Sequence, residues 1–183
     1  MASVFSHALT AYALKNFTTN PLLNKKFLFF VVVSSIMPDI DILAFRFDIA
    51  YGELWGHRGM THSLFFALIW SVLLWFIVSK SSDYKDLPLI SKTSLTAVII
   101  LFLSTSSHGF LDAMTNGGLG VAFFSPFDTT RYFLPWQPIQ VSPIGISAFF
   151  SSTGLRVILS ELIWVGIPAL ILLILLKVKN RVQ

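Results

Sequence analysis

Two long apolar runs constrain the fold of this chain more than any other feature. Residues 63–79 and 156–176 are almost continuously apolar, and the second run encloses only one carboxylate, Glu161. A helix needs about 20 predominantly apolar residues to cross the hydrocarbon core of a bilayer. The mean hydropathy of +0.75 and the hydrophobic fraction of 55% lie outside the range of ordinary soluble domains. The sequence therefore predicts an integral membrane protein.

We expect the chain to form an all-α helical bundle, because helices satisfy their own backbone hydrogen bonds in lipid. The five expected segments are residues 4–17, 27–37, 63–79, 94–114 and 156–176. The second should stop at Pro38, so that Asp39 and Asp41 would leave the helix in an extended turn. The first two are short for a full crossing and should be buried, tilted or half-inserted. All five belong to one membrane-embedded domain, residues 1–183.

Basic residues follow alternate segments of this predicted bundle. They are Lys15, Lys25, Lys26, Lys80, Lys85, Lys92, Lys177, Lys179 and Arg181. If successive segments alternate in direction, all of these fall at one end, which the positive-inside rule makes cytoplasmic. The prediction is a multi-pass membrane protein with a cytoplasmic C-terminus. The net charge of +4 then reflects topology, and we expect no nucleic-acid partner.

Histidines and aspartates gather at the opposite ends of the same segments. The set is His7, Asp39, Asp41, His57, His62, His108 and Asp112. Such groups in apolar sequence are costly unless something pairs them, and divalent metal ions are the expected partner. The chain has no cysteine, so the ligands would be imidazole and carboxylate, which suit Zn, Mn or Fe. We predict a metal site at the outer edge of the bilayer.

Spacing within this set favours catalysis by more than one ion. His108 and Asp112 are four apart and share a helix face, while His57 and His62 flank a turn at Gly59. Seven ligands exceed the three or four that one catalytic zinc needs, so we expect two or more ions, zinc first and manganese as the alternative. Adjacent ions could activate water against a phosphoester.

Asp39 and Asp41 are the candidates for orienting that water or acting as its base, and their spacing does not separate a base from a ligand. Each group could instead have a purely structural role. His7 could be an interfacial histidine, Asp39 and Asp41 could cap the loop after Pro38, and His108 with Asp112 could be a buried pair.

Two other charged residues could each have more than one role. Arg58 could neutralise a phosphate in catalysis, or it could pair with Glu53 or Asp48. Glu161 could be a further ligand, a partner of a ligating histidine, or a partner of Arg156.

Three hydroxyl residues and one arginine complete the candidates. Thr61, Ser107 and Thr115 border the ligands and are better second-layer donors than nucleophiles. Arg131 could contact a lipid headgroup, with Asp128 as the local alternative.

Residues 117–153 form a long outer connection rich in aromatic side chains. Aromatic rings among prolines suit the membrane interface. The connection could be a loop packed over the bundle or a lip that admits a lipid-like substrate.

Several blocks of this sequence resemble a known family. They are Ser-His-Ala, Met-Pro-Asp-Ile-Asp, His-Arg-Gly-Met-Thr-His-Ser, Ser-His-Gly-Phe-Leu-Asp, Arg-Tyr-Phe-Leu-Pro-Trp-Gln and Ile-Leu-Ser-Glu-Leu. Over nearly the whole chain these resemble the YdjM/YbcI-type family of bacterial inner-membrane metal-dependent hydrolases. The resemblance implies a membrane-embedded metal-dependent hydrolase.

A more distant similarity is to the zinc-dependent phospholipase C and P1 nuclease group. That similarity implies zinc ligands at His7, at Asp39 or Asp41, at His62, and at His108 with Asp112. The group has further ligands downstream, whereas no histidine follows His108 here and Glu161 is the one late acidic candidate. The resemblance therefore supports two ions better than three.

The favoured function is hydrolysis of a phospholipid or polyprenyl-phosphate-like phosphoester by metal-activated water, with the lipid bilayer and this substrate as partners. The alternative is a non-catalytic metal-binding or transport protein of the membrane. A transporter would need polar residues continuing through the apolar runs, which are nearly absent. An intramembrane metalloprotease is disfavoured because the chain has no His-Glu-x-x-His motif.

Overall fold

The protein is all-helical in its computed structural model, which describes residues 1–143 and 145–182, with only the backbone for Ile146, Ser147, Arg181 and Val182. The helices are α1 Val4–Lys15, α2 Lys25–Ile36, η1 Met37–Phe47, η2 Met60–His62, α3 Leu64–Val78, α4 Lys92–Ala113, α5 Ile146–Phe149, α6 Ser152–Glu161, η3 Leu162–Gly166 and α7 Ile167–Val182. Here η1 and η2 are 3-10 helices, and η3 is a π-helical turn. Within the described residues, β-pairing is limited to two isolated bridges.

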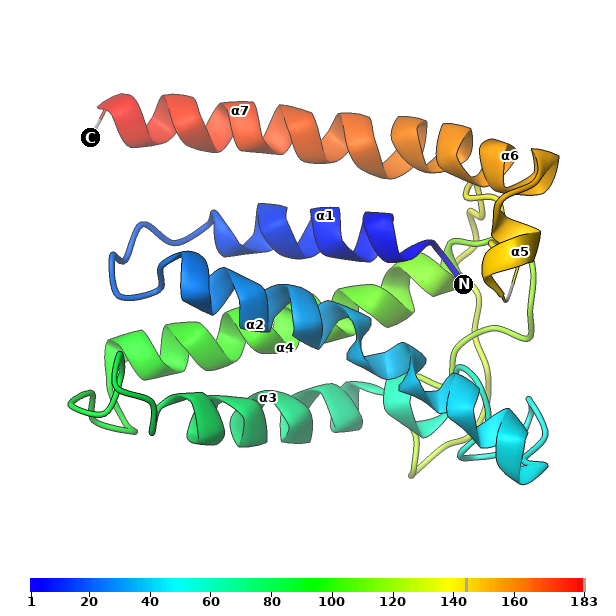
Figure 1. Cartoon of the computed structure of the whole chain (residues 1–183), viewed down its shortest axis with the longest axis horizontal. Coiled ribbons are helices and arrows are strands. Elements are labelled where there is room, and N and C mark those ends of the chain that lie inside the picture. The colour runs from blue at the N-terminus through cyan, green and yellow to red at the C-terminus, as the bar shows by residue number, and fades with distance from the viewer. Residues whose placement is uncertain (144, 183) are drawn as a thin grey trace.

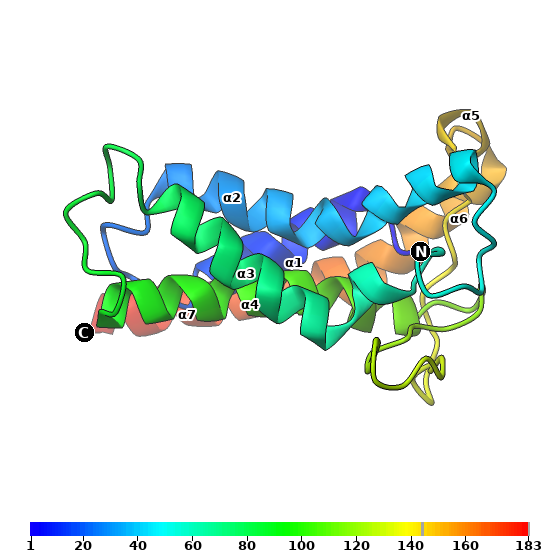
Figure 2. The same ribbon diagram turned by 90° about the horizontal axis from the view of Figure 1, so that it is seen from below.

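The long helices run back and forth along one axis (Figure 1). Helix α4 packs against α1, α2 and α3, while α2 also packs against α1. Helices α6 and α7, joined by η3, form one continuous run that lies along α1, and the view from below shows the same elongated bundle (Figure 2). The predicted all-α bundle is confirmed.

Polar side chains define where the helices begin. Ser63 accepts a hydrogen bond from the backbone N–H of Phe66 at the start of α3, and Asn24 accepts one from Lys26 at the start of α2. Each satisfies a backbone donor that the first turn of a helix leaves free. The segments predicted at residues 63–79 and 94–114 therefore lie within about two residues of α3 and α4.

Helix α2 ends at Ile36, just before Pro38, but the extended turn expected there was wrong. The chain continues from α2 into the 3-10 helix η1, with Pro38 in its first turn. Proline is tolerated there because its missing N–H would have no partner in the first turn of a helix. Helix η1 ends at Asp48, whose φ of 58° is left-handed. Asp39 and Asp41 consequently lie on a helix and not in an extended turn.

Within the described part of the chain, three helical runs are long and apolar enough to cross a membrane. They are Lys25–Phe47, Lys92–Ala113 and Ser152–Asn180. The second expected segment, judged short from its sequence, gains its length from η1. Helix α3 is apolar but shorter, with 15 residues, and α1 has 12.

The interior and the outer surface of the bundle are both apolar. Phe27, Val31, Trp75 and Leu101 lie in a buried core between α2, α3 and α4. Large apolar side chains such as Leu73 on α3 are about half exposed, at 47% for this residue. An apolar outer surface is the arrangement that a hydrocarbon solvent favours.

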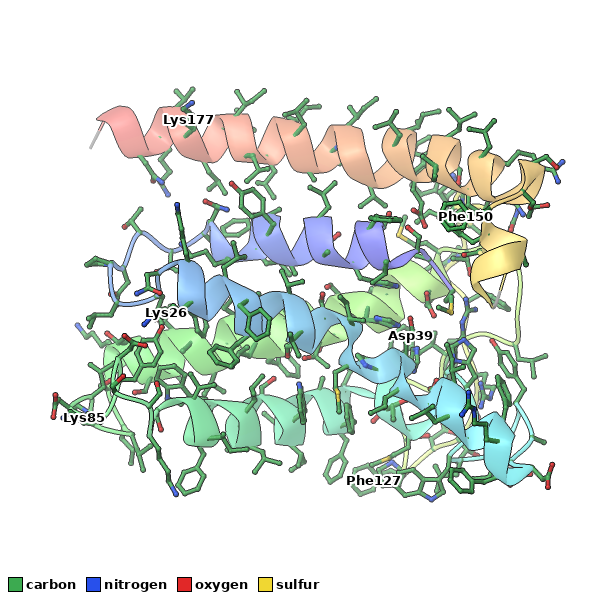
Figure 3. All side chains as sticks on the ribbon, in the orientation of Figure 1. Lys26, Asp39, Lys85, Phe127, Phe150 and Lys177 are labelled. Carbon is green, nitrogen blue, oxygen red and sulfur yellow. The ribbon has the colours of Figure 1, made fainter. Side chains whose placement is uncertain are left out.

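The lysines and the candidate ligands lie at opposite ends of the bundle, as the sequence predicts. Lys26, Lys85 and Lys177 lie toward one end, while Asp39 lies toward the other (Figure 3). The connections after α1 and α3 and the end of α7 meet at the lysine end (Figure 1).

The aromatic connection packs over the bundle in part, and part of it is exposed. Phe123 is buried against α4, whereas Phe127 and Phe150 are 81% and 83% exposed at the ligand end of the molecule. Arg131 does not pair with Asp128. Its guanidinium donates to the carbonyl oxygens of His57, Tyr51 and Glu53, so it ties this connection to the loop before η2.

Candidate metal centre

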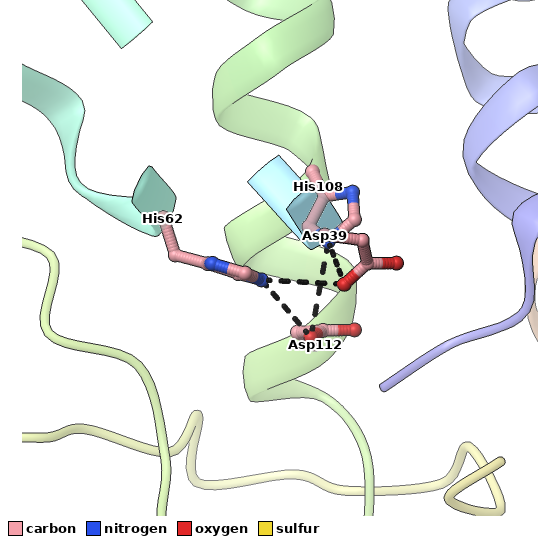
Figure 4. Close-up of side chains that lie close together, drawn as sticks. All are labelled: Asp39, His62, His108 and Asp112. Atoms are coloured by element: carbon pink, nitrogen blue, oxygen red, sulfur yellow. Dashed lines mark hydrogen bonds and ion pairs between the residues drawn. The ribbon is translucent and has the colours of Figure 1, made fainter. Parts of the chain in front are cut away.

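Four side chains from three helical elements converge at the ligand end. They are Asp39 on η1, His62 on η2, and His108 and Asp112 on α4 (Figure 4). His62 Nε2 lies 3.7 Å from Asp39 Oδ1 and 3.6 Å from Asp112 Oδ2. His108 Nε2 lies 3.2 Å from Asp39 Oδ1 and 4.0 Å from Asp112 Oδ2. We call these four residues the Asp39 group.

These separations match the size of a tetrahedral ion site. Ligands held at 2.0–2.1 Å from a central zinc lie about 3.3 Å from one another. The four histidine-to-carboxylate separations in the Asp39 group range from 3.2 to 4.0 Å, which is close to that value. Two imidazole nitrogens and two carboxylate oxygens are also the donor types that zinc accepts.

Both histidines of the Asp39 group are oriented by their other ring nitrogen. His108 Nδ1 lies 2.7 Å from the backbone oxygen of Ser35, and His62 Nδ1 lies 3.0 Å from Asp41 Oδ2. An Nδ1–H donated to an oxygen leaves the Nε2 lone pair free to bind an ion. The two Nε2 atoms are the ones that face the centre of the group.

Several buried ring nitrogens in and beside the Asp39 group have no hydrogen-bond partner in the described part of the chain. Within the described residues, His62 Nε2 and both ring nitrogens of His7 are buried and have no hydrogen-bond partner. Burial alone would lower the pKa of His62, but the neighbouring carboxylates of Asp112, Asp39 and Asp41 raise it well above its ordinary value. The surrounding carboxylates therefore favour positive charge at this position, which fits a divalent ion.

His7 lies beside the Asp39 group rather than within it. Its ring stacks on that of His108 with centroids 3.7 Å apart, and its Nε2 lies 3.7 Å from Asp112 Oδ1. The other oxygen of Asp112 faces His62 and His108. Asp112 thus presents one oxygen to His7 and one to the centre of the group, as a bridging carboxylate would.

Asp41 has a different environment from Asp39. Its Oδ1 lies 2.7 Å from His57 Nδ1, and its Oδ2 accepts hydrogen bonds from Thr61 Oγ1 and from the backbone N–H of Arg58. We call Asp41, His57 and His62 the Asp41 group, since their ligand atoms also lie close enough to hold an ion. The Asp41 carboxylate is already satisfied by protein donors, however, and His62 is shared with the Asp39 group.

Arg58 is fully buried and holds Asp112. Its Nε donates to Asp112 Oδ2 at 3.0 Å, and its two terminal nitrogens donate to Gly117 O and Thr115 Oγ1. Neither Glu53 nor Asp48 is its partner, so the expected alternative pairing was wrong. A Cβ on Gly118, where φ is +90°, would lie 2.8 Å from Arg58 Nη1, so this close approach requires glycine.

Glu161 is not among the converging ligands. It is buried on α6, where its carboxylate accepts hydrogen bonds from the backbone N–H and the hydroxyl of Ser3. The Arg156 side chain instead donates to Thr153. Glu161 therefore fastens the segment before α1 to α6.

Among the hydroxyl candidates, Thr61 and Thr115 are donors or acceptors around the ligands, while Ser107 donates to the Ser104 carbonyl within α4. Two contacts were missed because they involve backbone atoms: the Ser35 carbonyl at His108, and the Ala2 N–H that donates to Asp112. Backbone groups carry no residue-type signal in a sequence.

The fold and this site define a helical membrane protein whose buried histidines and carboxylates can hold a metal ion. The chain belongs to the YdjM inner membrane protein family, which it matches over residues 1–182. It is 34% identical over 181 residues to inner membrane protein YbcI of Escherichia coli (strain K12), covering 99% of this chain and 100% of that protein. No solved structure matches it. These descriptions name no activity, so hydrolysis and the similarity to phospholipase C and P1 nuclease remain predictions.

Proposed function

We propose that this protein is a metal-dependent hydrolase of membrane phosphoesters, with a phospholipid or polyprenyl-phosphate-like substrate. The observation that carries the proposal is the convergence of Asp39, His62, His108 and Asp112 around one point. A divalent ion held there, zinc or alternatively manganese, would lower the pKa of water and polarise a phosphoryl oxygen.

Within this proposal the two aspartates of η1 have separate roles. The Asp39 side chain is 11% exposed, whereas those of His62, His108 and Asp112 are fully buried. Asp39 is therefore the carboxylate that a substrate or a water molecule reaches, and it would orient or deprotonate that water. Asp41 would orient the His62 ring through the contact between its Oδ2 and His62 Nδ1.

Arg58 would act mainly by holding Asp112. Its three guanidinium nitrogens all donate to protein atoms, so the predicted contact with a phosphate would compete with those bonds. The guanidinium also supplies a fixed positive charge near the site, which favours an anionic substrate.

Metal analysis of the purified protein tests the first part of the proposal. Wild type should carry bound metal, and a variant with both His108→Ala and Asp112→Ala should carry none above background. Hydrolysis of labelled phospholipids and polyprenyl phosphates under added zinc or manganese tests the second part. Bound metal without hydrolysis would favour the alternative, a metal-binding or transport protein.

For orientation, we propose that the lysine end is cytoplasmic and the Asp39 group faces the outer side of an inner membrane. A reporter fused after Gln183 should report a cytoplasmic location. An external signal from that reporter would reverse the placement of the site.

A further inference from the structure

The ligands of the Asp39 group are largely buried, so a substrate needs a route to reach them. Asp39 is the one of the four with an exposed edge, because η1 lies on the outside of the bundle at this level. Access through the other three ligands would require the surrounding helices to part. The approach is therefore from the Asp39 side.

A shallow hollow opens at Asp39. Its volume is about 370 Å³, and it is lined by Val33, Ile36, Met37, Ile40 and Asp39. It lies where α2 changes into η1. A 3-10 helix is narrower than an α-helix and turns its side chains by a different angle per residue, so the surface is discontinuous at this junction. Four aliphatic side chains thus surround one carboxylate.

The depth of this hollow in a bilayer follows from the helix geometry. Asp39 lies at most about 24 Å along the axis from Lys25, at rises of 1.5 Å per residue in α2 and 2.0 Å in η1. The hydrocarbon core is about 30 Å thick. With Lys25 at one boundary, Asp39 lies a few ångströms inside the other, and the hollow faces lipid chains and not bulk water.

A second hollow provides a comparison. It lies between α1 and the α6–η3 run and has a volume of 340 Å³. Its lining is Phe5, Leu9, Ile158, Leu162 and Gly166 together with Ser6 and Glu161. None of its lining residues belongs to the Asp39 group or the Asp41 group. It can contact lipid without presenting it to the ligands.

We propose that the hollow at Asp39 binds an acyl chain of a phospholipid, so that the phosphoester reaches the Asp39 group sideways from within the bilayer. The inference rests on the proposed function and specifies its substrate as a phospholipid. The aliphatic lining fits a straight hydrocarbon chain, and Asp39 at its edge places the ion site next to the headgroup end of that chain. A water-soluble phosphoester has no long hydrocarbon chain to contact this lining.

Photolabelling tests the binding step without requiring turnover. The full-length protein is placed in vesicles of phosphatidylethanolamine and phosphatidylglycerol that contain a phosphatidylglycerol with a diazirine in one acyl chain. We expect adducts at Val33, Ile36, Met37 and Ile40 at least fivefold above those at Leu73, an exposed residue of α3. Even labelling across all exposed apolar faces would overturn the proposal.

Two matched variants make the result specific. Ile40→Trp fills the hollow at Asp39, and Leu162→Trp fills the comparison hollow; the two side chains are 47% and 58% exposed. Ile40→Trp should reduce adducts at Val33 and Ile36 at least fivefold, and Leu162→Trp should leave them unchanged. Equal effects of both variants would overturn the proposal. Val33→Trp replaces Ile40→Trp if that variant does not fold.

The ratio of two activities separates this proposal from the proposed function. For Ile40→Trp, hydrolysis of a long-chain phospholipid relative to a short-chain, water-soluble phosphoester should fall about tenfold, and for Leu162→Trp the ratio should not change. Labelling concentrated at the hollow at Asp39, without any hydrolysis, would overturn the proposed hydrolase function alone. Hydrolysis with even labelling, or with an unchanged ratio in Ile40→Trp, would overturn the acyl-chain proposal alone.

Discussion

Asp39 and Asp41 lie two residues apart on one helix, yet they belong to different chemical environments. Successive side chains on a 3-10 helix are rotated by about 120°, so residues two apart diverge. Asp39 faces two imidazole Nε2 atoms and keeps an exposed edge, while Asp41 is buried and accepts hydrogen bonds from protein donors. The difference teaches that the Asp39 group is the better candidate for an ion site, since the Asp41 carboxylate is already hydrogen-bonded by protein donors.

The largest effect should come from removing two members of the Asp39 group. A variant with both His108→Ala and Asp112→Ala should bind zinc at least about 1,000-fold more weakly, because two of four ligands are lost. Phe110→Ala on the same helix, at a position 44% exposed, is the control. Metal content after dialysis against a defined zinc buffer measures both. Retention of the ion in the double variant would remove the Asp39 group as the site.

Arg58 connects the two groups and should matter most for stability. Its backbone N–H donates to Asp41 and its side chain to Asp112. Arg58→Met would leave the buried carboxylate of Asp112 without its partner, which costs about 3–5 kcal/mol in the free energy of unfolding. Denaturation of the metal-free protein in mixed detergent measures this loss. Arg131→Met is the control, since Arg131 donates to carbonyl oxygens and not to a carboxylate.

Comparing Asp39→Asn with Asp41→Asn tests the division of roles directly. Asp41→Asn should weaken zinc binding by about 10–100-fold, the usual effect of losing a group that orients a ligand. It should still reach the wild-type metal content at high zinc concentration. Asp39→Asn removes a ligand and should weaken binding further. If Asp41→Asn has the larger effect on affinity, the assignment of the two aspartates is reversed.

The smallest effect is expected at His57. His57→Phe keeps the ring but removes the nitrogen that lies 2.7 Å from Asp41. The number of ions per chain should not change, and the affinity should fall by less than about threefold, since the group acts only through Asp41. A fall from two ions per chain to one would show instead that the Asp41 group binds the second ion predicted from the sequence.

The sequence predicts the broad features of this protein because they depend on local patterns. Apolar runs predict the helices at α3 and α4, and alternating lysines predict that ligands and positive charge lie at opposite ends. The four-residue spacing of His108 and Asp112 predicts that both face the same way from α4. These predictions need no knowledge of which helices pack together.

Predictions at Pro38 and Arg58 failed for an identifiable reason. Proline excludes an α-helical hydrogen bond at Pro38, but it does not exclude the start of a 3-10 helix, and tertiary packing selects that outcome. For Arg58 the structural alternative to a phosphate contact was a pair with Glu53 or Asp48, whereas its carboxylate partner, Asp112, is 54 residues away. Local spacing carries no information about such a pair.

The sequence by itself determined that the chain is a helical membrane protein with histidines and aspartates at one end, since hydrophobicity and residue chemistry are properties of each segment. Only the tertiary structure decided that Asp39 joins His62, His108 and Asp112 while Asp41 supports them. The physical reason is that an ion site needs lone pairs to converge within a few ångströms. That convergence depends on how η1, η2 and α4 pack, and no single segment specifies it.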